Sequence, residues 1–265
     1  MKSVRKALTI AGSDSGAGAG IQADLKTFAA LGVYGTSAIT AVTAQNTIGV
    51  TRVLALHPDL VAAQIDAILD DIGAHALKTG MLANAAIIAV VAQKIRRYRL
   101  QNLVVDPVMV ATSGDLLIKQ NAVAALRSRL IPLATVVTPN LPEAEALVGK
   151  PLRTSEEIEG AARQIVAMGA RAVVIKGGHR QGPAVDLFFD GQKMHALSAP
   201  RIRTKNTHGT GCTFAAAIAA ELAKGENLES AVRTAKDYIT AAIRAGFKIG
   251  AGHSPVHHFQ RFWKR

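Results

Sequence analysis

The sequence is poor in cysteine and in aromatic residues. It contains one cysteine among 265 residues, so no disulfide framework can form within the chain. Aromatic residues make up only 4%, which is few for a protein that binds nucleic acids by stacking bases on aromatic side chains. A lack of disulfides is typical of reducing compartments, and we therefore expect a cytoplasmic protein.

Long apolar runs are also missing. The apolar stretch Ala85–Ala92 is far shorter than the roughly 20 residues that a membrane span requires. Residues 7–11 follow a basic N-terminus, but Asp14 comes too soon afterwards for a signal peptide. These residues instead predict a first strand, and we expect no membrane contact.

Acidic residues are outnumbered by basic ones. The 31 Lys and Arg against 19 Asp and Glu give a formal net charge of +12, which indicates an anionic partner. The densest basic group, residues 94–99, closes an apolar helical stretch. Cations are favourable at the negative end of a helix dipole, so we interpret this group as a solvated helix end. We expect no nucleic-acid partner, because a basic stripe with interleaved aromatic residues is absent from the sequence.

Short apolar runs alternate with longer helical patterns, which predicts an α/β fold with a mostly parallel sheet. We expect strands at residues 7–11, 36–42, 76–79, 103–105, 136–138 and 172–175, and helices at 21–31, 60–69, 85–98, 122–130, 155–168, 213–223 and 228–245. An antiparallel hairpin is expected at 184–189 and 193–197, because Asp190-Gly191 favours a tight turn. No linker or change of composition divides the chain, so we expect one domain over residues 1–265.

Polar and glycine-rich segments follow most of the predicted strands. In parallel sheets, ligands bind at the carboxyl ends of the strands, although such loops are commonly rich in Gly and Asp for conformational reasons alone. The first segment, Gly12–Gly20, is not a dinucleotide motif, because Ile21 stands where the third glycine of G-x-G-x-x-G belongs. No P-loop sequence occurs either. We predict a small-molecule site.

The segment Asn206–Thr213 is the strongest motif. Its glycines let backbone N–H groups converge at the start of a helix, which is the arrangement of an anion-binding loop. Cys212 lies in the predicted first turn, where the helix dipole is expected to lower the pKa of the thiol. A buried, inert cysteine is the open alternative.

Six segments together resemble one known family. They are Ala11–Asp14 with Gly18–Asp24, then Ala41–Thr47, Asp106–Met109, Thr138–Glu145, Lys176–His179 and Asn206–Thr213. In this order they resemble the hydroxymethylpyrimidine/phosphomethylpyrimidine kinases of thiamine biosynthesis, within the ribokinase-like superfamily. The resemblance implies a three-layer sandwich, phosphorylation of a pyrimidine alcohol and then of its monophosphate, ATP and Mg²⁺ as cofactors, and a homodimer. The sequence departs from the family at Gly16 and Ala17, where relatives often have Ser and Gly.

The resemblance also implies roles for individual residues. Gly209, Thr210 and Gly211 match the anion hole, and Cys212 matches the catalytic base. The matching substrate contacts are Gln45, Asp24, Gly12, Val42, Met81 and Val108; the ATP contacts are Lys176, Asn140 and His208; and the magnesium ligands are Asp106 and Glu143.

Simpler roles remain open for several of these residues. Without the resemblance, Gln45 could be a buried residue at a strand end, Asp24 a solvated helix charge and Lys176 a solvated lysine. Glu143 could cap a helix. A pyridoxal or pyridoxine kinase of the same superfamily is the alternative activity.

Overall fold

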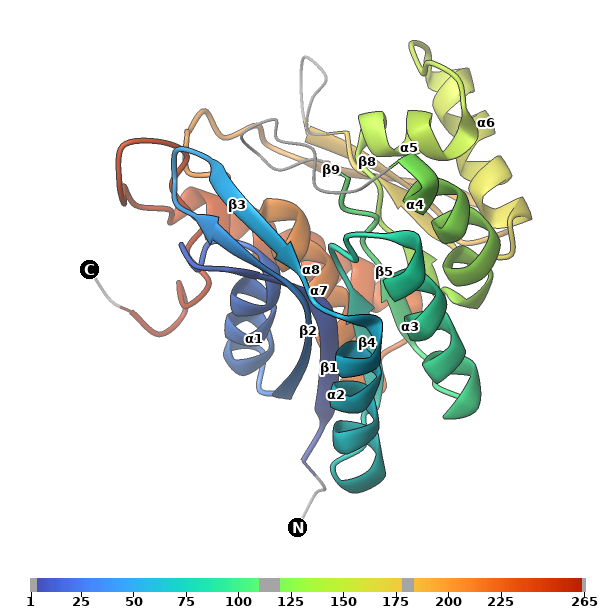
Figure 1. The fold of residues 1–265 in the computed structure, drawn as a ribbon. Coiled ribbons are helices and arrows are strands. Elements are labelled where there is room, and N and C mark those ends of the chain that lie inside the picture. Colours follow the sequence, from blue (N-terminus) through green and yellow to red (C-terminus); the bar gives the residue numbers. More distant parts are fainter. Residues whose placement is uncertain (1–3, 110–119, 178–183, 264–265) are drawn as a thin grey trace.

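The computed structural model describes residues 4–109, 120–177 and 184–263. Its strands form one nine-stranded sheet in the order β3-β2-β1-β4-β5-β6-β7-β8-β9 (Figure 1). They span β1 Lys6–Asp14, β2 Tyr34–Gln45, β3 Val50–Ala55, β4 Ala76–Thr79, β5 Leu103–Val105, β6 Val136–Val137, β7 Val173–Ile175, β8 Ala184–Phe189 and β9 Met194–Ala199. Strands β1, β2, β4, β5, β6 and β7 are parallel to one another, whereas β3, β8 and β9 pair antiparallel at the two edges. The predicted mostly parallel α/β fold is confirmed.

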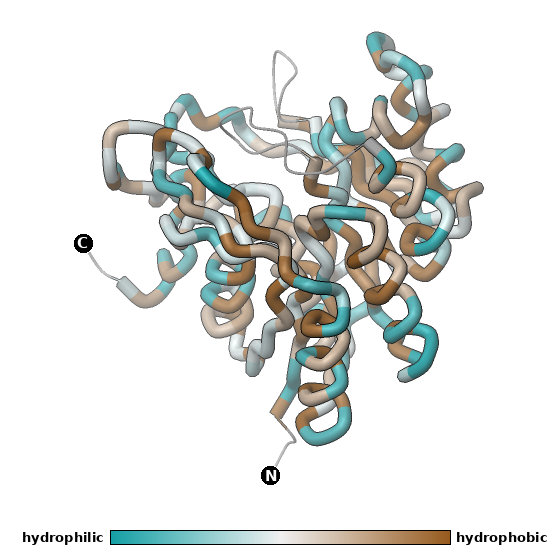
Figure 2. Tube along the Cα trace, in the orientation of Figure 1, coloured by the Kyte–Doolittle hydropathy of each residue, from teal (hydrophilic) through white to brown (hydrophobic). Residues whose placement is uncertain are grey.

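Helices cover both faces of the sheet and bury two separate apolar clusters. The helices are α1 Gly20–Ala30, α2 Pro58–Asp71, α3 Ala85–Arg97, α4 Gln120–Ala125, α5 Leu141–Val148, α6 Ser155–Ala167, α7 Thr210–Lys224 and α8 Leu228–Arg244. Successive residues of β5 contribute to opposite faces of the sheet. Val105 belongs to the apolar cluster beneath α2, α3 and α6, whereas Val104 belongs to the cluster beneath α1, α7 and α8. Figure 2 shows the corresponding hydrophobic colouring along the central strands.

The structure differs from the expected elements in several details. Strand β3 and helix α5 were not predicted, and α7 begins at Thr210 rather than at residue 213. The predicted helix over residues 122–130 is α-helical as far as Ala125 and continues as a π-helical turn from Leu126 to Leu130. The predicted hairpin exists as β8 and β9, but it extends the main sheet, because Val173 in β7 pairs with Phe189 in β8.

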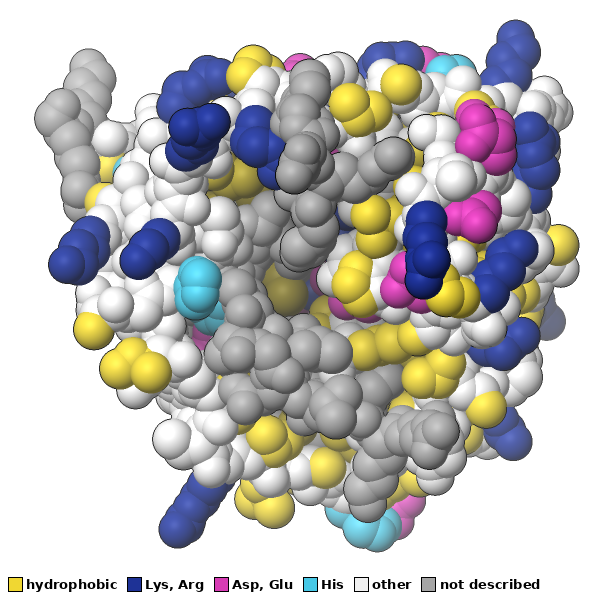
Figure 3. All heavy atoms as spheres, turned by 90° about the horizontal axis from the view of Figure 1, so that it is seen from above, with side chains coloured by type: hydrophobic (Ala, Val, Ile, Leu, Met, Phe, Trp, Pro, Cys, Tyr) yellow, Lys and Arg dark blue, Asp and Glu magenta, His cyan; other side chains and the backbone are white. Residues whose placement is uncertain are grey.

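The carboxyl ends of the parallel strands lie on one face of the molecule, which Figure 3 shows from above. This face is hollowed near its centre.

His179, at the end of the segment that begins with Lys176, lies outside the described residues. Among the helices that are described, none is long and apolar enough to cross a membrane.

Candidate active site

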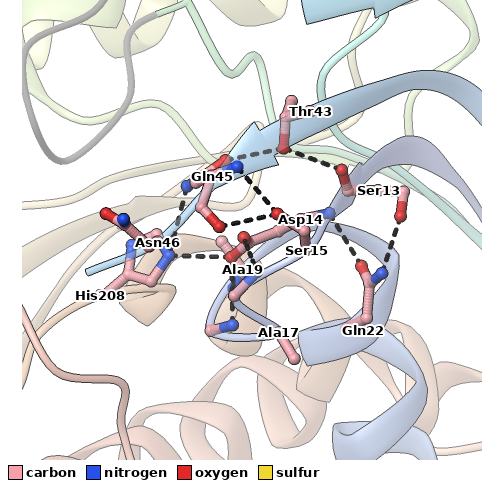
Figure 4. A network of polar contacts seen from close by, with 12 residues as sticks. Ser13, Asp14, Ser15, Ala17, Ala19, Gln22, Thr43, Gln45, Asn46 and His208 are labelled. Atoms are coloured by element: carbon pink, nitrogen blue, oxygen red, sulfur yellow. Dashed lines mark hydrogen bonds and ion pairs between the residues drawn. The ribbon is translucent and has the colours of Figure 1, made fainter. Parts of the chain in front are cut away.

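The first glycine-rich loop folds around the carboxylate of Asp14, at the end of β1. Backbone N–H groups of Gly16, Gly18 and Ala19 donate to it over 2.8, 3.0 and 2.8 Å. His208 adds a fourth contact, with Nε2 2.9 Å from Oδ2 of Asp14 (Figure 4). Burial alone would raise the pKa of Asp14, but the bonds from His208 and Ala19 outweigh it and lower the pKa. Asp14 is therefore ionised at neutral pH and organises the loop.

The two glycine-rich segments are in direct contact. A Cβ on Gly209 would lie 1.8 Å from the carbonyl oxygen of Gly18, and a Cβ on Gly18 would lie 2.2 Å from the His208 ring. Gly209 also has a φ of 76°, in the left-handed region that favours glycine. These contacts require glycine at both positions, because any side chain would push the segments apart.

Four of the predicted substrate contacts lie together near the ends of β1, β2 and β4. A Cβ on Gly12 would lie 2.7 Å from the Met81 methyl carbon and 3.7 Å from the carbonyl oxygen of Ala41. Val42, the next residue along β2, is 45% exposed, so it is available to a ligand. At the end of the same strand, Gln45 is half-buried. We refer to Gly12, Val42, Gln45 and Met81 as the ring subsite.

His208 was predicted as an ATP contact, and the structure places it beside the ring subsite. Its Nε2 atom lies 3.4 Å from Nε2 of Gln45 (Figure 4). The C-terminal segment holds its backbone, because the N–H of His208 donates to Ser254 and its carbonyl accepts from Val256. His208 thus joins three distant parts of the chain.

The other two predicted substrate contacts lie deeper. Val108, after β5, is half-buried and packs against the apolar cluster that contains Met81. Asp24 on α1 is completely buried. It accepts hydrogen bonds from Lys78 in β4 over 2.9 and 3.0 Å and from Thr9 in β1 over 2.6 Å. In this conformation Asp24 supports the site from within the core.

Gly211, Lys176 and Asp106 meet at the start of α7. A Cβ on Gly211 would lie 3.3 Å from Nζ of Lys176 and 3.8 Å from Oδ2 of Asp106. The Lys176 ammonium donates to Oδ1 of Asp106 over 3.0 Å and lies 4.0 Å from Oε2 of Glu143. Burial alone would lower the pKa of Lys176, but these two carboxylates outweigh it and raise the pKa. A lysine charge therefore stands beside the N-terminus of a helix, which suits an anion.

Asn140 and Glu143 form a reciprocal cap at the start of α5. The N–H of Glu143 donates to Oδ1 of Asn140 over 2.9 Å, and the N–H of Asn140 donates to Oε2 of Glu143 over 2.8 Å. Glu143 thus fills the capping role that was left open, while it also faces Lys176. Burial raises the pKa of the Glu143 carboxyl to about 7, although the Lys176 charge opposes this shift.

The expectation that the helix dipole lowers the pKa of Cys212 was wrong. Burial raises the pKa of the thiol to about 11, and the carboxylates of Asp24 and Asp106 add to the increase. The Lys78 charge and the N–H of Gly20 pull in the opposite direction without overcoming burial. Desolvation therefore dominates, and Cys212 is a neutral thiol at pH 7.

The carboxylates near Lys176 fit a magnesium site in which water and phosphate oxygens would supply the remaining ligands. Oδ2 of Asp106 is buried and has no hydrogen-bond partner among the described residues, so it is an acceptor suited to a cation. Within the described ranges, no three His, Cys, Asp or Glu side chains form a metal-binding group. Mg²⁺ is commonly held by one or two carboxylates together with water and phosphate oxygens, and Asp106 with Glu143 could supply that number.

Comparison with known proteins identifies the family. A family model described as phosphomethylpyrimidine kinase matches residues 14–257. The chain belongs to the phosphomethylpyrimidine kinase family. A relative in Rhizobium meliloti, named hydroxymethylpyrimidine/phosphomethylpyrimidine kinase, is 56% identical over 262 residues, which are 97% of this chain and 98% of the relative. The chain is accordingly a kinase, as the resemblance implied.

Solved structures with a similar fold include kinases for two types of substrate. Pyridoxal kinase from Bacillus subtilis, solved as an ADP complex, has a TM-score of 0.91 and 44% identity, covering 98% of this chain and all of that one. Phosphomethylpyrimidine kinase from Clostridium difficile has a TM-score of 0.81 and 42% identity, covering 91% of this chain and all of that one. The ribokinase-like expectation for the fold is thereby confirmed.

Two buried charged residues of this kinase were not among the predicted site residues, although both have sequence signals. Asp14 stands two residues before Gly16, and aspartates commonly accept a backbone N–H two residues ahead in turns. Lys78 stands within the apolar strand Ala76–Thr79, and a lysine in a central parallel strand needs a buried partner. The partners themselves, His208 and Asp24, are distant in the sequence.

Proposed function

We propose that this kinase transfers the γ-phosphoryl group of ATP to 4-amino-5-hydroxymethyl-2-methylpyrimidine, and then phosphorylates the monophosphate to the diphosphate, in thiamine diphosphate biosynthesis. The observation that carries the proposal is the meeting of Gly211, Lys176 and Asp106 at the start of α7. Such a site can hold a phosphoryl group. The identity of 56% to a relative named for both phosphorylations supports the substrate.

Each group at the start of α7 suits one task of phosphoryl transfer. The N–H groups of Gly209, Thr210 and Gly211 can donate to the transferred group as its charge develops. Lys176 supplies a positive charge beside them. Mg²⁺, when bound through Asp106 and Glu143, would neutralise phosphate charge.

Cys212 is the proposed acceptor of the proton from the substrate alcohol, a role that only its thiolate can perform. The thiol must therefore lose its own proton in the loaded site, an ionisation that burial opposes and the Lys78 charge favours. The phosphate acceptor of the second reaction is already ionised and needs no base. We therefore expect Cys212→Ala to slow phosphorylation of the alcohol at least tenfold more than phosphorylation of the monophosphate. Equal losses in both reactions, in a folded variant, would indicate a structural or positioning role instead.

The ring subsite supports a flat heteroaromatic substrate. Gln45 carries a hydrogen-bond donor and an acceptor side by side, which complements a ring nitrogen next to an exocyclic amine. Asn140 stays a predicted ATP contact. His208 was also predicted as one, but its position beside Gln45 favours a role at the ring subsite instead.

A pyridoxal kinase activity is the second candidate, because a pyridoxal kinase has the same fold with 44% identity. Parallel assays with ATP and Mg²⁺ test both proposals on the pyrimidine alcohol, its monophosphate and pyridoxal. We expect both pyrimidine compounds to be phosphorylated, with a higher kcat/KM than pyridoxal. Phosphorylation of pyridoxal without a second phosphorylation of the pyrimidine would contradict the main proposal.

We also propose that the kinase works in the cytoplasm as a homodimer that uses the edge of the sheet at β3. Val53 and Leu54 in this strand are 45% and 68% exposed. An exposed apolar edge strand is suited to pairing with another chain. Light scattering should give twice the chain mass for the wild type and the monomer mass for Leu54→Lys. A monomeric wild type at micromolar concentration would contradict the proposal.

A further inference from the structure

Asp14 and His208 form a buried pair that links the ring subsite to the anion-binding loop. The two residues are 194 positions apart, yet Nε2 of His208 lies 2.9 Å from Oδ2 of Asp14. Their side chains are 9% and 3% exposed, respectively. An ionised carboxylate only accepts hydrogen bonds, so Nε2 of His208 must carry a proton.

That proton determines which atom of the Gln45 amide, the oxygen or the nitrogen, is favourable beside His208. The end of the amide that is assigned as Nε2 of Gln45 lies 3.4 Å from Nε2 of His208. An amide nitrogen there would set two N–H donors against each other, whereas an amide oxygen could share the His208 proton. The histidine therefore favours the oxygen of Gln45 at this end.

Thr43, at the other end of the Gln45 amide, favours the same orientation. Its hydroxyl lies 3.0 Å from the carbonyl oxygen of Ser13, which can only accept. The same hydroxyl lies 3.1 Å from the second end of the Gln45 amide. A hydroxyl has one proton, and once it is donated to Ser13 the oxygen can only accept, so it favours the amide nitrogen of Gln45. The orientation of a glutamine amide is assigned from such partners, and both partners agree here.

We propose that the Asp14–His208 pair is a positioning device that holds the Gln45 amide with its oxygen toward His208 and its nitrogen toward Thr43. The remaining lone pair and N–H of Gln45 then face the ring in a fixed order. Reversal of the amide would set donor against donor and acceptor against acceptor on the same ring edge. His208 thus determines specificity without being required to touch the substrate. This inference rests on the proposed function for the role of Gln45 as a ring contact.

Two substitutions of His208 test the positioning role. His208→Phe keeps an aromatic ring against Gly18 but removes the Nε2 proton, whereas His208→Gln restores an N–H donor. For His208→Phe we expect KM for the pyrimidine alcohol to rise at least tenfold, with less than a twofold change in KM for ATP. The preference for the pyrimidine over pyridoxal, measured as the ratio of kcat/KM values, should fall at least tenfold. His208→Gln should recover most of that ratio.

A second histidine–aspartate pair provides the matched control. Nε2 of His195 lies 3.0 Å from Oδ2 of Asp190 on the β8–β9 hairpin, and its ring stacks on Phe188. His195→Phe should leave both KM values and the substrate ratio within twofold of the wild type. An unchanged ratio in His208→Phe, or an equal rise in KM for ATP, would overturn the positioning role.

A measurement without turnover separates this inference from the proposed function. In the free enzyme, the side-chain NH₂ signal of Gln45 can be assigned in a ¹⁵N–¹H spectrum by its loss in Gln45→Glu. We expect one dominant, exchange-protected signal in the wild type and in His195→Phe, and averaging or loss of protection in His208→Phe. An identical Gln45 signal in wild type and His208→Phe contradicts the inference. An ordered Gln45 in a protein that does not phosphorylate the pyrimidine contradicts only the proposed function.

Discussion

The ammonium of Lys78 lies 2.9 and 3.0 Å from the two carboxylate oxygens of Asp24, and neither side chain has any exposed surface. The pair connects β4 to α1 beneath Cys212, whose thiol is affected by both charges. Burial opposes the charge on Lys78, but the adjacent Asp24 carboxylate outweighs it and raises the pKa of the lysine. Burial also raises the pKa of Asp24, but its two oxygens accept from Lys78 and one of them from Thr9, so the geometry favours a charged pair in the core.

Removal of one partner should destabilise the protein strongly. Lys78→Met leaves the Asp24 carboxylate buried without a countercharge, and we expect a loss of about 3–5 kcal/mol in the free energy of unfolding. The double variant Lys78→Met/Asp24→Asn should lose less than the single one, because no isolated charge remains. Urea denaturation measures both. Arg233→Ala, which breaks an exposed pair with Glu229, is the control and should cost about 0.5 kcal/mol or less. A similar small cost for Lys78→Met would contradict a charged core pair.

Central elements could be predicted from the sequence, whereas edge elements and long-range contacts could not. Strands β4 and β5 have the expected bounds, because buried parallel strands are continuous apolar runs. Strand β3 is half-buried at Val50 and exposed in the rest of its length, so it lacks that signal. Helix α5 was not predicted, although Glu143 was considered as a helix cap and Pro142 is favourable in the first turn of a helix.

The candidate site shows the same limit. The glycine segments could be recognised because short-range backbone geometry demands glycine there. The pairing of Asp14 with His208 depends on the packing of segments 194 residues apart, and no local pattern encodes it. The pKa of Cys212 was predicted in the wrong direction, because the dipole depends on local sequence, whereas desolvation depends on the surrounding fold.

Ala17→Gly should stabilise the protein. Ala17 has a φ of 58°, in the left-handed region that costs a non-glycine residue about 1–2 kcal/mol. Glycine also gives the unfolded chain more freedom, which offsets part of the gain. We expect a net increase of about 0.5–1 kcal/mol in the free energy of unfolding, measured by urea denaturation. Ala29→Gly, on the exposed face of α1, should change stability by about the same amount in the opposite direction. A loss of stability in Ala17→Gly would show that the left-handed conformation is not strained.

The single thiol should react slowly with iodoacetamide at neutral pH. With a pKa of about 11, Cys212 has about 300-fold less thiolate at pH 7.5 than a free cysteine with a pKa of about 8.5. The rate in the folded protein should be at least ~100-fold below that of the urea-unfolded chain, as followed by mass spectrometry. It should rise about tenfold per pH unit up to pH 9. Equal rates in folded and unfolded protein would contradict the raised pKa.

The raised pKa of Cys212 also predicts how the free energy of unfolding depends on pH. The thiol keeps its proton to a higher pH in the folded state than in the unfolded state. Its contribution to stability is therefore fully present below about pH 8.5 and is lost progressively as the pH rises toward 11. Unfolding curves at pH 8 and pH 10 should show a smaller decrease in Cys212→Ala than in the wild type. An equal decrease in both proteins would assign the pH dependence to other groups.

Gly211→Ala should impair phosphoryl transfer while leaving the fold intact. Gly211 lies in α7 with φ outside the left-handed region, so alanine fits the backbone there. The new methyl group would lie 3.3 Å from Nζ of Lys176, on the side where the phosphoryl group is expected. We expect kcat to fall at least a hundredfold, because oxyanion-type sites are sensitive to the loss of one donor or to a small displacement. Thermal unfolding should occur within a few degrees of the wild type.

A second glycine provides the control for this variant. Gly160 lies within α6, where an added Cβ meets no atom within 4 Å, so Gly160→Ala introduces the same methyl group far from Lys176. We expect it to leave kcat unchanged and to raise stability by about 0.5–1 kcal/mol, because alanine favours helices. Wild-type kcat in a folded Gly211→Ala enzyme would mean that the transferred group does not approach the start of α7. The anion-binding assignment would then rest on Lys176 rather than on the backbone of Gly209–Gly211.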